Sequence, residues 1–341
     1  MTTYFLRRLL LLIPTFLGIT ALVFAITRIV PGGPIEQMLM KLSMGDVTGG
    51  GAGDVVTSVD VPDEVLDELR ARYRFDEPIW RAYVLWLGDL LTFDLGRSYK
   101  YNLPVVDVIA ARLPVSLYFG VIGFLLAYVV CIPLGILKAV RHGSAFDVVT
   151  SALVFFGYAI PGWAFGALLL VLLGGGSFWD LVPLGGFRSP DWEQLGFWGR
   201  VGDQLHHTLL PVLAYAVGSF ATLTLLMKNA LLDNLSQDYV RTAFAKGLTE
   251  RRVVLGHALR NSLIPICTGL GHSLGIVMAG SYLIEKVFNI DGIGYLGYTS
   301  IIERDYAVVL GILVVNTLLV LLGNILSDVL YVFVDPRIRF S

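Results

Sequence analysis

Two serine and glycine patterns in this 341-residue chain have the form of known catalytic or binding motifs. Residues 271–275 read GHSLG, which fits the G-x-S-x-G pattern that presents the nucleophile of serine hydrolases. That pattern needs a strand before the serine and a helix after it, whereas Ser273 lies inside a long apolar run. We therefore expect no catalytic residue, and an intramembrane serine hydrolase that uses Ser273 is kept as a rival hypothesis.

Nucleotide and metal chemistry have weaker signals. GIGYLG, at 292–297, fits G-x-G-x-x-G, but no alternation of strands and helices surrounds it, so we expect an exterior turn. Neither H-E-x-x-H nor G-x-x-x-x-G-K-[ST] occurs in the sequence. We therefore expect this chain to bind no metal or cofactor and to hydrolyse no nucleotide.

The apolar runs determine the fold class. The chain is 55% hydrophobic and 15% charged, which is more apolar surface than a soluble core of this length could bury. Helices are expected because the runs do not alternate as barrel strands would, and the first run is too long for a cleaved signal. The prediction is an all-α membrane protein with about six transmembrane helices, at 9–30, 113–137, 146–173, 207–227, 263–284 and 306–334.

The basic residues predict the orientation. Twelve of the 25 Lys and Arg lie in the two tails and in the loops after the second and fourth runs, whereas the two other short loops hold four. The positive-inside rule then places both termini and residues 241–265 in the cytoplasm. No basic, aromatic patch indicates nucleic acid. The predicted division is 1–30 (tail and first helix), 31–112 (periplasmic segment), 113–334 (five-helix core with a cytoplasmic loop at 228–262) and 335–341 (tail).

The segment between the first two runs combines a glycine-rich stretch with two amphipathic ones. Residues 43–60 predict a flexible insert. Residues 61–75 and 78–91 predict exterior helices that lie on the membrane surface or on the bundle, the second with Trp80, Tyr83, Val84 and Leu87 on one face. A small capping subdomain that serves only packing is the alternative.

Residues 239–260 predict two helices joined at a glycine. Gly247 supplies the left-handed residue that ends the first helix, and Thr249 caps the second, with Glu250 in its first turn. On a helical wheel of the second helix, the apolar residues form one stripe. Arg251 falls within this stripe as an exception, and other cations flank it. Such a stripe on a cytoplasmic helix suggests docking into the groove of a partner. The stripe consists of Val254, Leu255, Ala258 and Leu259, and the flanking cations are Arg252, His257 and Arg260.

At this point the sequence resembles a known family. RTAFAKGL followed by HALRNSLIP is similar to the coupling loop, or EAA loop, of permease subunits of ABC importers, in the form used by the dipeptide and oligopeptide branch. Further matching motifs are RRLLLLIPT, PGGP, DLGRS, RLPVSL, IEKVFNIDGIG, RDY and DPRI, and GYAIPGW and GGGSFWDLVPLGGF resemble the subgroup that imports microcin C-like peptides. The chain departs from the general pattern at Arg241-Thr242-Ala243, where E-A-A would stand, and in the glycine-rich insert.

The resemblance implies a type I importer permease fold and a set of partners. These are a second homologous permease, two ATPase subunits that hold ATP and Mg, a periplasmic or lipid-anchored peptide-binding protein, and membrane lipid. The helix from Leu248 to Leu259 would sit in a cleft of the ATPase and act as a lever. The predicted coupling residues are Arg241, Ala243, Ala245, Gly247, Thr249, Glu250, Arg251, Val254, Leu255, Ala258, Leu259 and Arg260.

Four residues of the fifth run and its end are candidates for the translocation path: His272, Ser273, Met278 and Glu285. An ionisable group such as His272 is costly inside a membrane, so it lines a wet path or hydrogen-bonds to a neighbouring helix, and both alternatives stay open. A channel or secondary transporter that needs no ATPase is a third functional hypothesis.

Overall fold

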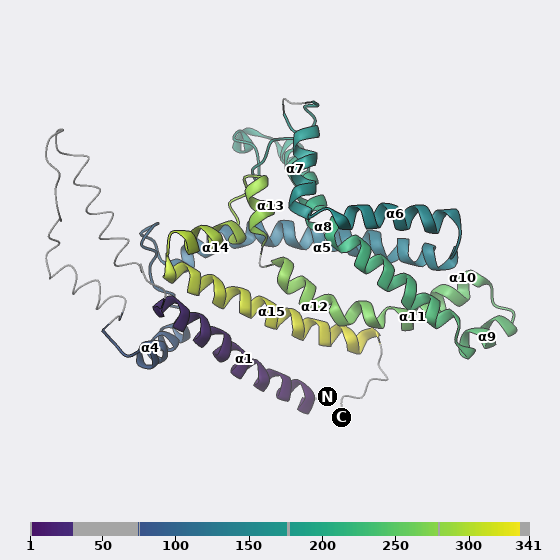
Figure 1. The fold of residues 1–341 in the computed structure, drawn as a ribbon, viewed down its shortest axis with the longest axis horizontal. Helices are drawn as coiled ribbons and strands as arrows, with labels where there is room; N and C mark the ends of the chain where they lie inside the picture. The colour runs from purple at the N-terminus through teal and green to yellow at the C-terminus, as the bar shows by residue number, and fades with distance from the viewer. Residues whose placement is uncertain (1, 30–73, 75, 176–177, 279, 335–341) are drawn as a thin grey trace. The chain divides into compact units, whose positions relative to one another are not determined.

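The computed structural model describes residues 2–29, 74, 76–175, 178–278 and 280–334. In these residues the chain consists of helices and loops, with two isolated bridges and no named strand (Figure 1). The predicted all-α class is confirmed. The α-helices are α1 (Thr2–Ile29), α4 (Ile79–Leu91), α5 (Val105–Val140), α6 (Ala145–Ala159), α7 (Gly162–Leu173), α8 (Phe197–Leu235), α9 (Asp238–Ala245), α10 (Glu250–Val253), α11 (Leu259–Ser262), α12 (Ile264–Met278), α13 (Tyr282–Val287), α14 (Ile293–Ile302) and α15 (Tyr306–Val334).

The chain divides into two compact units. Unit 1 comprises Met1–Tyr4, Arg112–Leu296 and Asn316–Ser341, and unit 2 comprises Phe5–Ala111 and Gly297–Val315. The predicted division at residues 30, 112 and 334 remains a prediction. The glycine-rich insert at 43–60 and almost all of the helix predicted at 61–75 lie outside the described residues.

Four described helices are long and apolar enough to cross a membrane: Leu10–Ile29, Val105–Val140, Phe197–Leu235 and Tyr306–Val329. Helices α6 and α7 make a fifth crossing if they count as one span, because they meet at a bend of 96°. The segment predicted as one helix at 146–173 therefore consists of two helices. Ile160 precedes Pro161 and takes an extended conformation (φ −97°, ψ 123°), since a residue before proline disfavours the helical region.

The fifth predicted span, 263–284, is also divided. Helix α12 has 15 residues and is therefore about 22 Å long, short of the roughly 30 Å hydrocarbon core. Gly280 follows with φ +81°, a left-handed conformation that glycine adopts easily, and α13 then begins at Tyr282. The prediction of one span over 263–284 is corrected to two shorter helices.

Helix α4 confirms the amphipathic helix predicted at 78–91, and the chain itself covers only part of the predicted face. Trp80 and Val84 are 71% and 59% exposed, whereas Ala82 is fully buried. Tyr83 packs its ring against Phe24 of α1, with centroids 5.5 Å apart. Periodicity alone placed Trp80 and Val84 with Tyr83, but the contact with α1 determines which side is covered.

Small residues bring helices of unit 1 into close contact, as is common for glycines in membrane helices. A Cβ on Gly162 of α7 would lie 2.4 Å from the carbonyl oxygen of Ala214 in α8. A Cβ on Gly275 of α12 would lie 2.7 Å from the Cα of Val320 in α15. Neither distance is compatible with a side chain, so these glycines set the helix spacing.

A buried ionic cluster links α5, α6 and α8 in unit 1. The carboxylate of Asp147 in α6 lies between two ammonium groups, 3.0 Å from that of Lys138 in α5 and 2.8 Å from that of Lys228 in α8. The ammonium of Lys138, which is fully buried, also donates to the hydroxyls of Thr150 and Ser151. Because each of the three charged groups has a partner of opposite sign, the cluster joins three helices, and it carries one net positive charge.

Replacing Asp147 with Asn should destabilise the fold, because it leaves two ammonium groups close together without a counter-charge. We expect a loss of about 3 to 5 kcal/mol, seen as a lower melting temperature of the purified protein in detergent. The matched control is Asp233→Asn, on the exposed surface of α8. Equal melting temperatures for the two variants would contradict a stabilising role for the cluster.

Candidate functional site

Residues 238–262, which we call the elbow, contain α9, a tight turn and a second helical stretch. Gly247 has φ +80°, which confirms the predicted left-handed residue at the end of the first helix. A Cβ there would meet no atom within 4 Å, so glycine is favoured by the backbone conformation and not by a lack of space. Thr249 stands at the N-cap as predicted, with extended backbone, but its side chain makes no capping hydrogen bond.

The second helical stretch of the elbow is not α-helical throughout. It begins as α10, continues as a π-helical segment over Val254–Ala258, and ends as α11. The sequence predicted a uniform α-helix here. A π segment is an α-helix with an extra residue, and such segments often occur at functional sites.

The apolar stripe of the elbow faces the chain's own bundle. Val253, Val254 and Ala258 are buried, and they form one cluster with residues of four other helices. The prediction that the stripe is presented to a partner is therefore wrong for Val254 and Ala258. Ala243, also predicted as a coupling residue, is buried in the same cluster. The other helices contribute Ala139 (α5), Met227 and Leu231 (α8), Val240 and Ala243 (α9) and Ile266 (α12).

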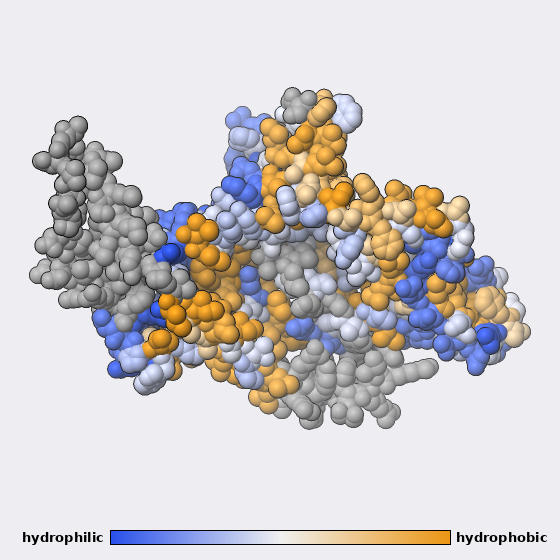
Figure 2. All heavy atoms as spheres, in the orientation of Figure 1, coloured by the Kyte–Doolittle hydropathy of each residue, from blue (hydrophilic) through white to orange (hydrophobic). Residues whose placement is uncertain are grey.

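The opposite face of the elbow is exposed. It carries two large apolar side chains, Phe244 (46% exposed) and Leu255 (47%), among polar and charged residues. Figure 2 shows hydrophilic residues gathered at the end of the bundle that carries α9 and α10, and apolar residues over α7. Of the remaining predicted coupling residues, Leu259 is half-buried and the exposed ones are Arg241, Ala245, Gly247, Thr249, Glu250, Arg251 and Arg260.

Ser273, one of the predicted path residues, lines a cavity of about 220 Å³ between α5, α8 and α12. Tyr128 of α5 lines the same cavity. A third lining residue, Tyr215, accepts a hydrogen bond from the backbone N–H of Ser281 at 3.0 Å and also contacts Glu285. The side chains of His272 and Met278 lie outside what the structure describes.

Glu285, another predicted path residue, is only 1% exposed and binds the start of α14. Its carboxylate accepts hydrogen bonds from the hydroxyl of Ser116 (2.8 Å) and the backbone N–H of Tyr295 (2.6 Å). Burial raises the pKa of Glu285, and these hydrogen bonds oppose that shift. Its contact with Tyr215 brings it to the cavity wall, but a path-lining role stays a prediction.

The glycine motif at 292–297 takes part in the same contact. We expected an exterior turn, but α14 begins at Ile293, and the N–H of Ile293 donates to the Ser116 hydroxyl at 2.7 Å. A Cβ on Gly292 would lie 2.5 Å from the Glu285 carboxylate. The glycine therefore makes room for the acid that caps the helix.

A second buried carboxylate joins two other motifs, within unit 2. Asp305, in the RDY motif, accepts hydrogen bonds from the hydroxyl of Ser98 in DLGRS and from the backbone N–H of Lys100. Burial raises the pKa of Asp305, and the hydrogen bond from Ser98 acts in the opposite direction. These motifs therefore pair for structural reasons.

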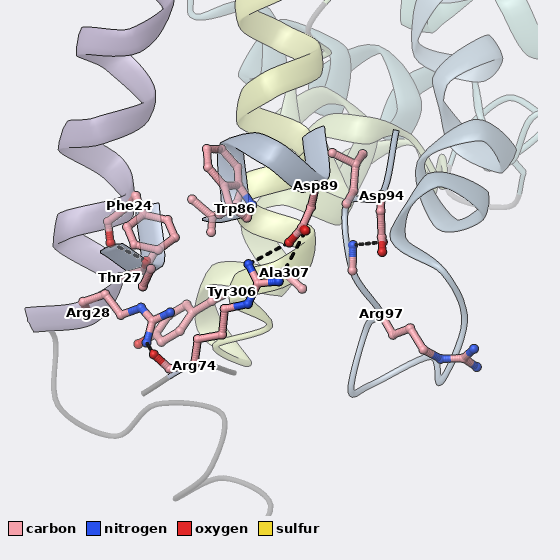
Figure 3. Close-up of a pocket in the computed structure, with 14 residues that line it drawn as sticks. Phe24, Thr27, Arg28, Arg74, Trp86, Asp89, Asp94, Arg97, Tyr306 and Ala307 are labelled. Atoms are coloured by element: carbon pink, nitrogen blue, oxygen red, sulfur yellow. Dashed lines mark hydrogen bonds and ion pairs between the residues drawn. The ribbon is translucent and has the colours of Figure 1, made fainter. Parts of the chain in front are cut away.

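Unit 2 also contains a cavity of about 300 Å³, with charged residues in its wall (Figure 3). Arg74 reaches toward Asp89 and pairs with it at 2.8 Å. Arg28 lies over the ring of Phe24, 5.1 Å from its centroid. Among the residues that the structure describes, no three His, Cys, Asp or Glu side chains are placed to hold a metal.

With this geometry established, the comparisons with known proteins identify the chain. Residues 131–340 match the family described as "Binding-protein-dependent transport system inner membrane component". The chain belongs to this family. It is accordingly an inner-membrane transport subunit and not an enzyme, so the hydrolase hypothesis for Ser273 is rejected. The self-sufficient channel or secondary transporter is rejected for the same reason.

Relatives match this transport subunit from end to end. It is 40% identical to the peptidoglycan transport system permease protein YejB of Agrobacterium fabrum, over 100% of this chain and 99% of that one. It is 41% identical to the inner membrane ABC transporter permease protein YejB of Escherichia coli O157:H7, over 100% of both chains. It is 35% identical to the oligopeptide transport system permease protein AppB of Bacillus subtilis, also over 100% of both.

A solved structure supports the predicted type I permease fold. The match is to a chain of the MetNI methionine ABC transporter, solved in inward-facing conformations, with a TM-score of 0.51 and 18% sequence identity. It covers 67% of this chain and 96% of that one. At this identity the likeness concerns the fold alone.

The contacts of Glu285 lead to a stability prediction for this permease. Glu285→Ala should leave the Ser116 hydroxyl and the backbone N–H of Tyr295 buried without their acceptor, at a cost of about 2 to 4 kcal/mol. The measurement is the melting temperature in detergent together with the amount of protein in the membrane. Glu193→Ala, at an exposed position, is the control, and equal behaviour of the two variants would rule out the capping role.

Proposed function

We propose that this chain is the permease subunit of an ATP-driven importer of peptides or peptide-like solutes. Relatives named for oligopeptide transport in Bacillus subtilis and for dipeptide transport in Escherichia coli support a peptide substrate. The Agrobacterium fabrum relative is named for peptidoglycan, whose fragments also carry peptides. The proposed substrate class is therefore defined by the peptide backbone and not by one side chain.

The proposed assembly has four kinds of partner in addition to membrane lipid. A second, homologous permease completes the channel, two ATPase subunits bind ATP and Mg, and a periplasmic or lipid-anchored protein delivers the peptide. Both termini and the elbow lie on the cytoplasmic side, which the distribution of Lys and Arg supports. No cofactor is proposed for this chain itself.

The observation that carries the proposal is the two-sided elbow. On one side Val254 and Ala258 pack into the chain's own bundle, and on the other Phe244 and Leu255 are exposed among charged residues. A partner that binds the exposed side would displace the bundle when it moves, because the buried side of the elbow packs against the bundle. The coupling surface is accordingly the exposed face, with the buried residues transmitting the force.

Transmission of force has a direct route in this arrangement. The buried cluster joins the elbow to Leu231 at the end of α8 and to Ile266 near the start of α12. Closely packed interfaces move as units because their side chains cannot deform continuously. Closure of the ATPases would therefore shift α8 and α12 together. The channel would then open alternately to the two sides of the membrane.

The turn at Gly247 provides a test of the lever. Gly247→Val should uncouple ATP hydrolysis from uptake, because a β-branched residue strongly disfavours φ +80°. Gly247→Asn is the matched control, since asparagine tolerates the left-handed region and the site has room for a side chain. The measurement is peptide uptake per ATP hydrolysed in proteoliposomes that contain the whole complex.

We expect the Val variant to lose most of its uptake while it remains in the membrane, and the Asn variant to keep most of it. If both variants import peptide as well as the parent, the turn does not transmit force and the lever hypothesis fails.

Crosslinking tests which face of the elbow meets the ATPase. In a background without Cys131 and Cys267, Leu255→Cys should form a crosslink to an ATPase subunit, because that side chain is exposed. Ala258→Cys is the control, since Ala258 is fully buried in the permease. The readout is the crosslinked band on a gel, and crosslinking at position 258 without crosslinking at 255 would reverse the proposed orientation.

A further inference from the structure

The cavity that Ser273 lines is a feature of three helices in unit 1. Its volume is about 220 Å³, and its wall is formed by segments of α5 and α8 with Ser273 of α12. The cavity reaches the surface of the chain at Gly218 and Thr222, which are exposed. The α5 residues are Gly123, Phe124, Ala127 and Tyr128, and the α8 residues are Tyr215, Gly218, Ser219, Thr222 and Leu223.

Small residues create this space. Gly123 lets α5 approach α8 so closely that a Cβ would lie 2.7 Å from that of Tyr215. On the other side, a Cβ on Gly218 would enter open space, with no atom within 4 Å. The two helices are therefore in contact at Gly123 and Tyr215, and they leave open space beside Gly218, where the cavity lies.

The described lining residues provide hydroxyl groups and aromatic rings but no charge. Tyr128, Tyr215, Ser219, Thr222 and Ser273 each carry a hydroxyl, which can both donate and accept a hydrogen bond. The rings of Phe124 and Tyr128 pack with centroids 4.4 Å apart. By contrast, the cavity of unit 2 is walled partly by arginines and aspartates.

Such a lining suits one kind of chemical group. The N–H and C=O of a peptide bond are uncharged, and each needs one hydrogen-bond partner when it leaves water. Hydroxyls can serve either of them, whereas a fixed charge in the wall would favour solutes of the opposite sign and repel those of the same sign. A wall of hydroxyls therefore accepts peptides regardless of their side-chain charge.

We infer that this cavity is a subsite on the translocation path that binds the backbone amides of the imported peptide and does not discriminate by charge. The inference rests on the proposed peptide function. It extends the prediction for Ser273 to four further residues that hydropathy did not single out: Tyr128, Tyr215, Ser219 and Thr222.

The position of the cavity also connects it to the elbow. Ile266, which packs on the elbow, precedes Ser273 by seven residues, or two helical turns on the same side of α12. Met227, also in the elbow cluster, follows Thr222 by five residues along α8. A shift of the elbow would therefore move two of the three walls of the cavity.

Charge introduced at Thr222 tests the assignment. We propose to compare Thr222→Lys, Thr222→Glu and the neutral control Thr222→Gln in proteoliposomes that contain the complete complex and its binding protein. The probes are the radiolabelled tripeptides Ala-Lys-Ala, Ala-Ala-Ala and Ala-Glu-Ala. Because every variant uses the same binding protein, selectivity that arises there cancels when the ratios of uptake are compared.

The Lys variant should lower uptake of Ala-Lys-Ala relative to Ala-Glu-Ala by about threefold to tenfold, and the Glu variant should do the reverse. The Gln variant should leave the ratio unchanged. The same three replacements at Gly218, where a side chain enters open space, provide a second set if the Thr222 variants do not accumulate.

Two outcomes would overturn the assignment in different ways. If the Lys and Glu variants change the uptake of all three peptides by the same factor, the cavity is not on the path, although the peptide function stands. If the parent complex imports none of the three peptides in an ATP-dependent manner, the peptide function fails and the subsite fails with it.

Discussion

The attraction between one buried carboxylate and two ammonium groups underlies the arrangement of this permease. Asp147 holds α6 to Lys138 of α5 and Lys228 of α8, and each lysine is followed or preceded by a member of the apolar cluster, Ala139 and Met227. The ionic cluster and the apolar cluster thus share the same helix ends. The elbow packs on a platform whose helices are already joined by charge, and in a low-dielectric setting such a joint opens only at high cost.

The motifs that identify the family have mainly structural roles here. Ser116 of RLPVSL and Glu285 of IEKVFNIDGIG meet at the start of α14, and Ser98 of DLGRS meets Asp305 of RDY. In both pairs a serine hydroxyl donates to a buried carboxylate from a distant part of the sequence. Each carboxylate also accepts backbone N–H groups, so it fixes a loop that has no regular hydrogen bonding of its own.

Much of the fold could be predicted from the sequence, because hydropathy and backbone preferences depend only on residues that are close together in the chain. The long helices α1, α5, α8 and α15, and the left-handed Gly247, were predictable in this way. The covered side of α4 and of the elbow was not, because a helical wheel shows which residues are apolar but not which neighbour covers them. The bend at Pro161 was underestimated because proline can kink a membrane helix or end it. Apart from Ser273, the cavity hydroxyls gave no sequence signal, and Lys138 and Lys228 were counted as loop cations because they directly follow the predicted spans 113–137 and 207–227.

The π-helical segment gives the elbow a particular outline. A π segment has one residue more than an α-helix would need to cover the same rise. Since Val254 and Ala258 are held inward, the surplus lies on the outward side, where Leu255, Gly256 and His257 stand exposed in succession. The second helical stretch of the elbow consequently bulges outward at these residues, whereas a regular α-helix would not. If the ATPase subunit binds this face as proposed, a groove shaped for a regular α-helix would clash with the bulge, so the groove would need a matching recess, and shape would then distinguish cognate from non-cognate ATPase subunits.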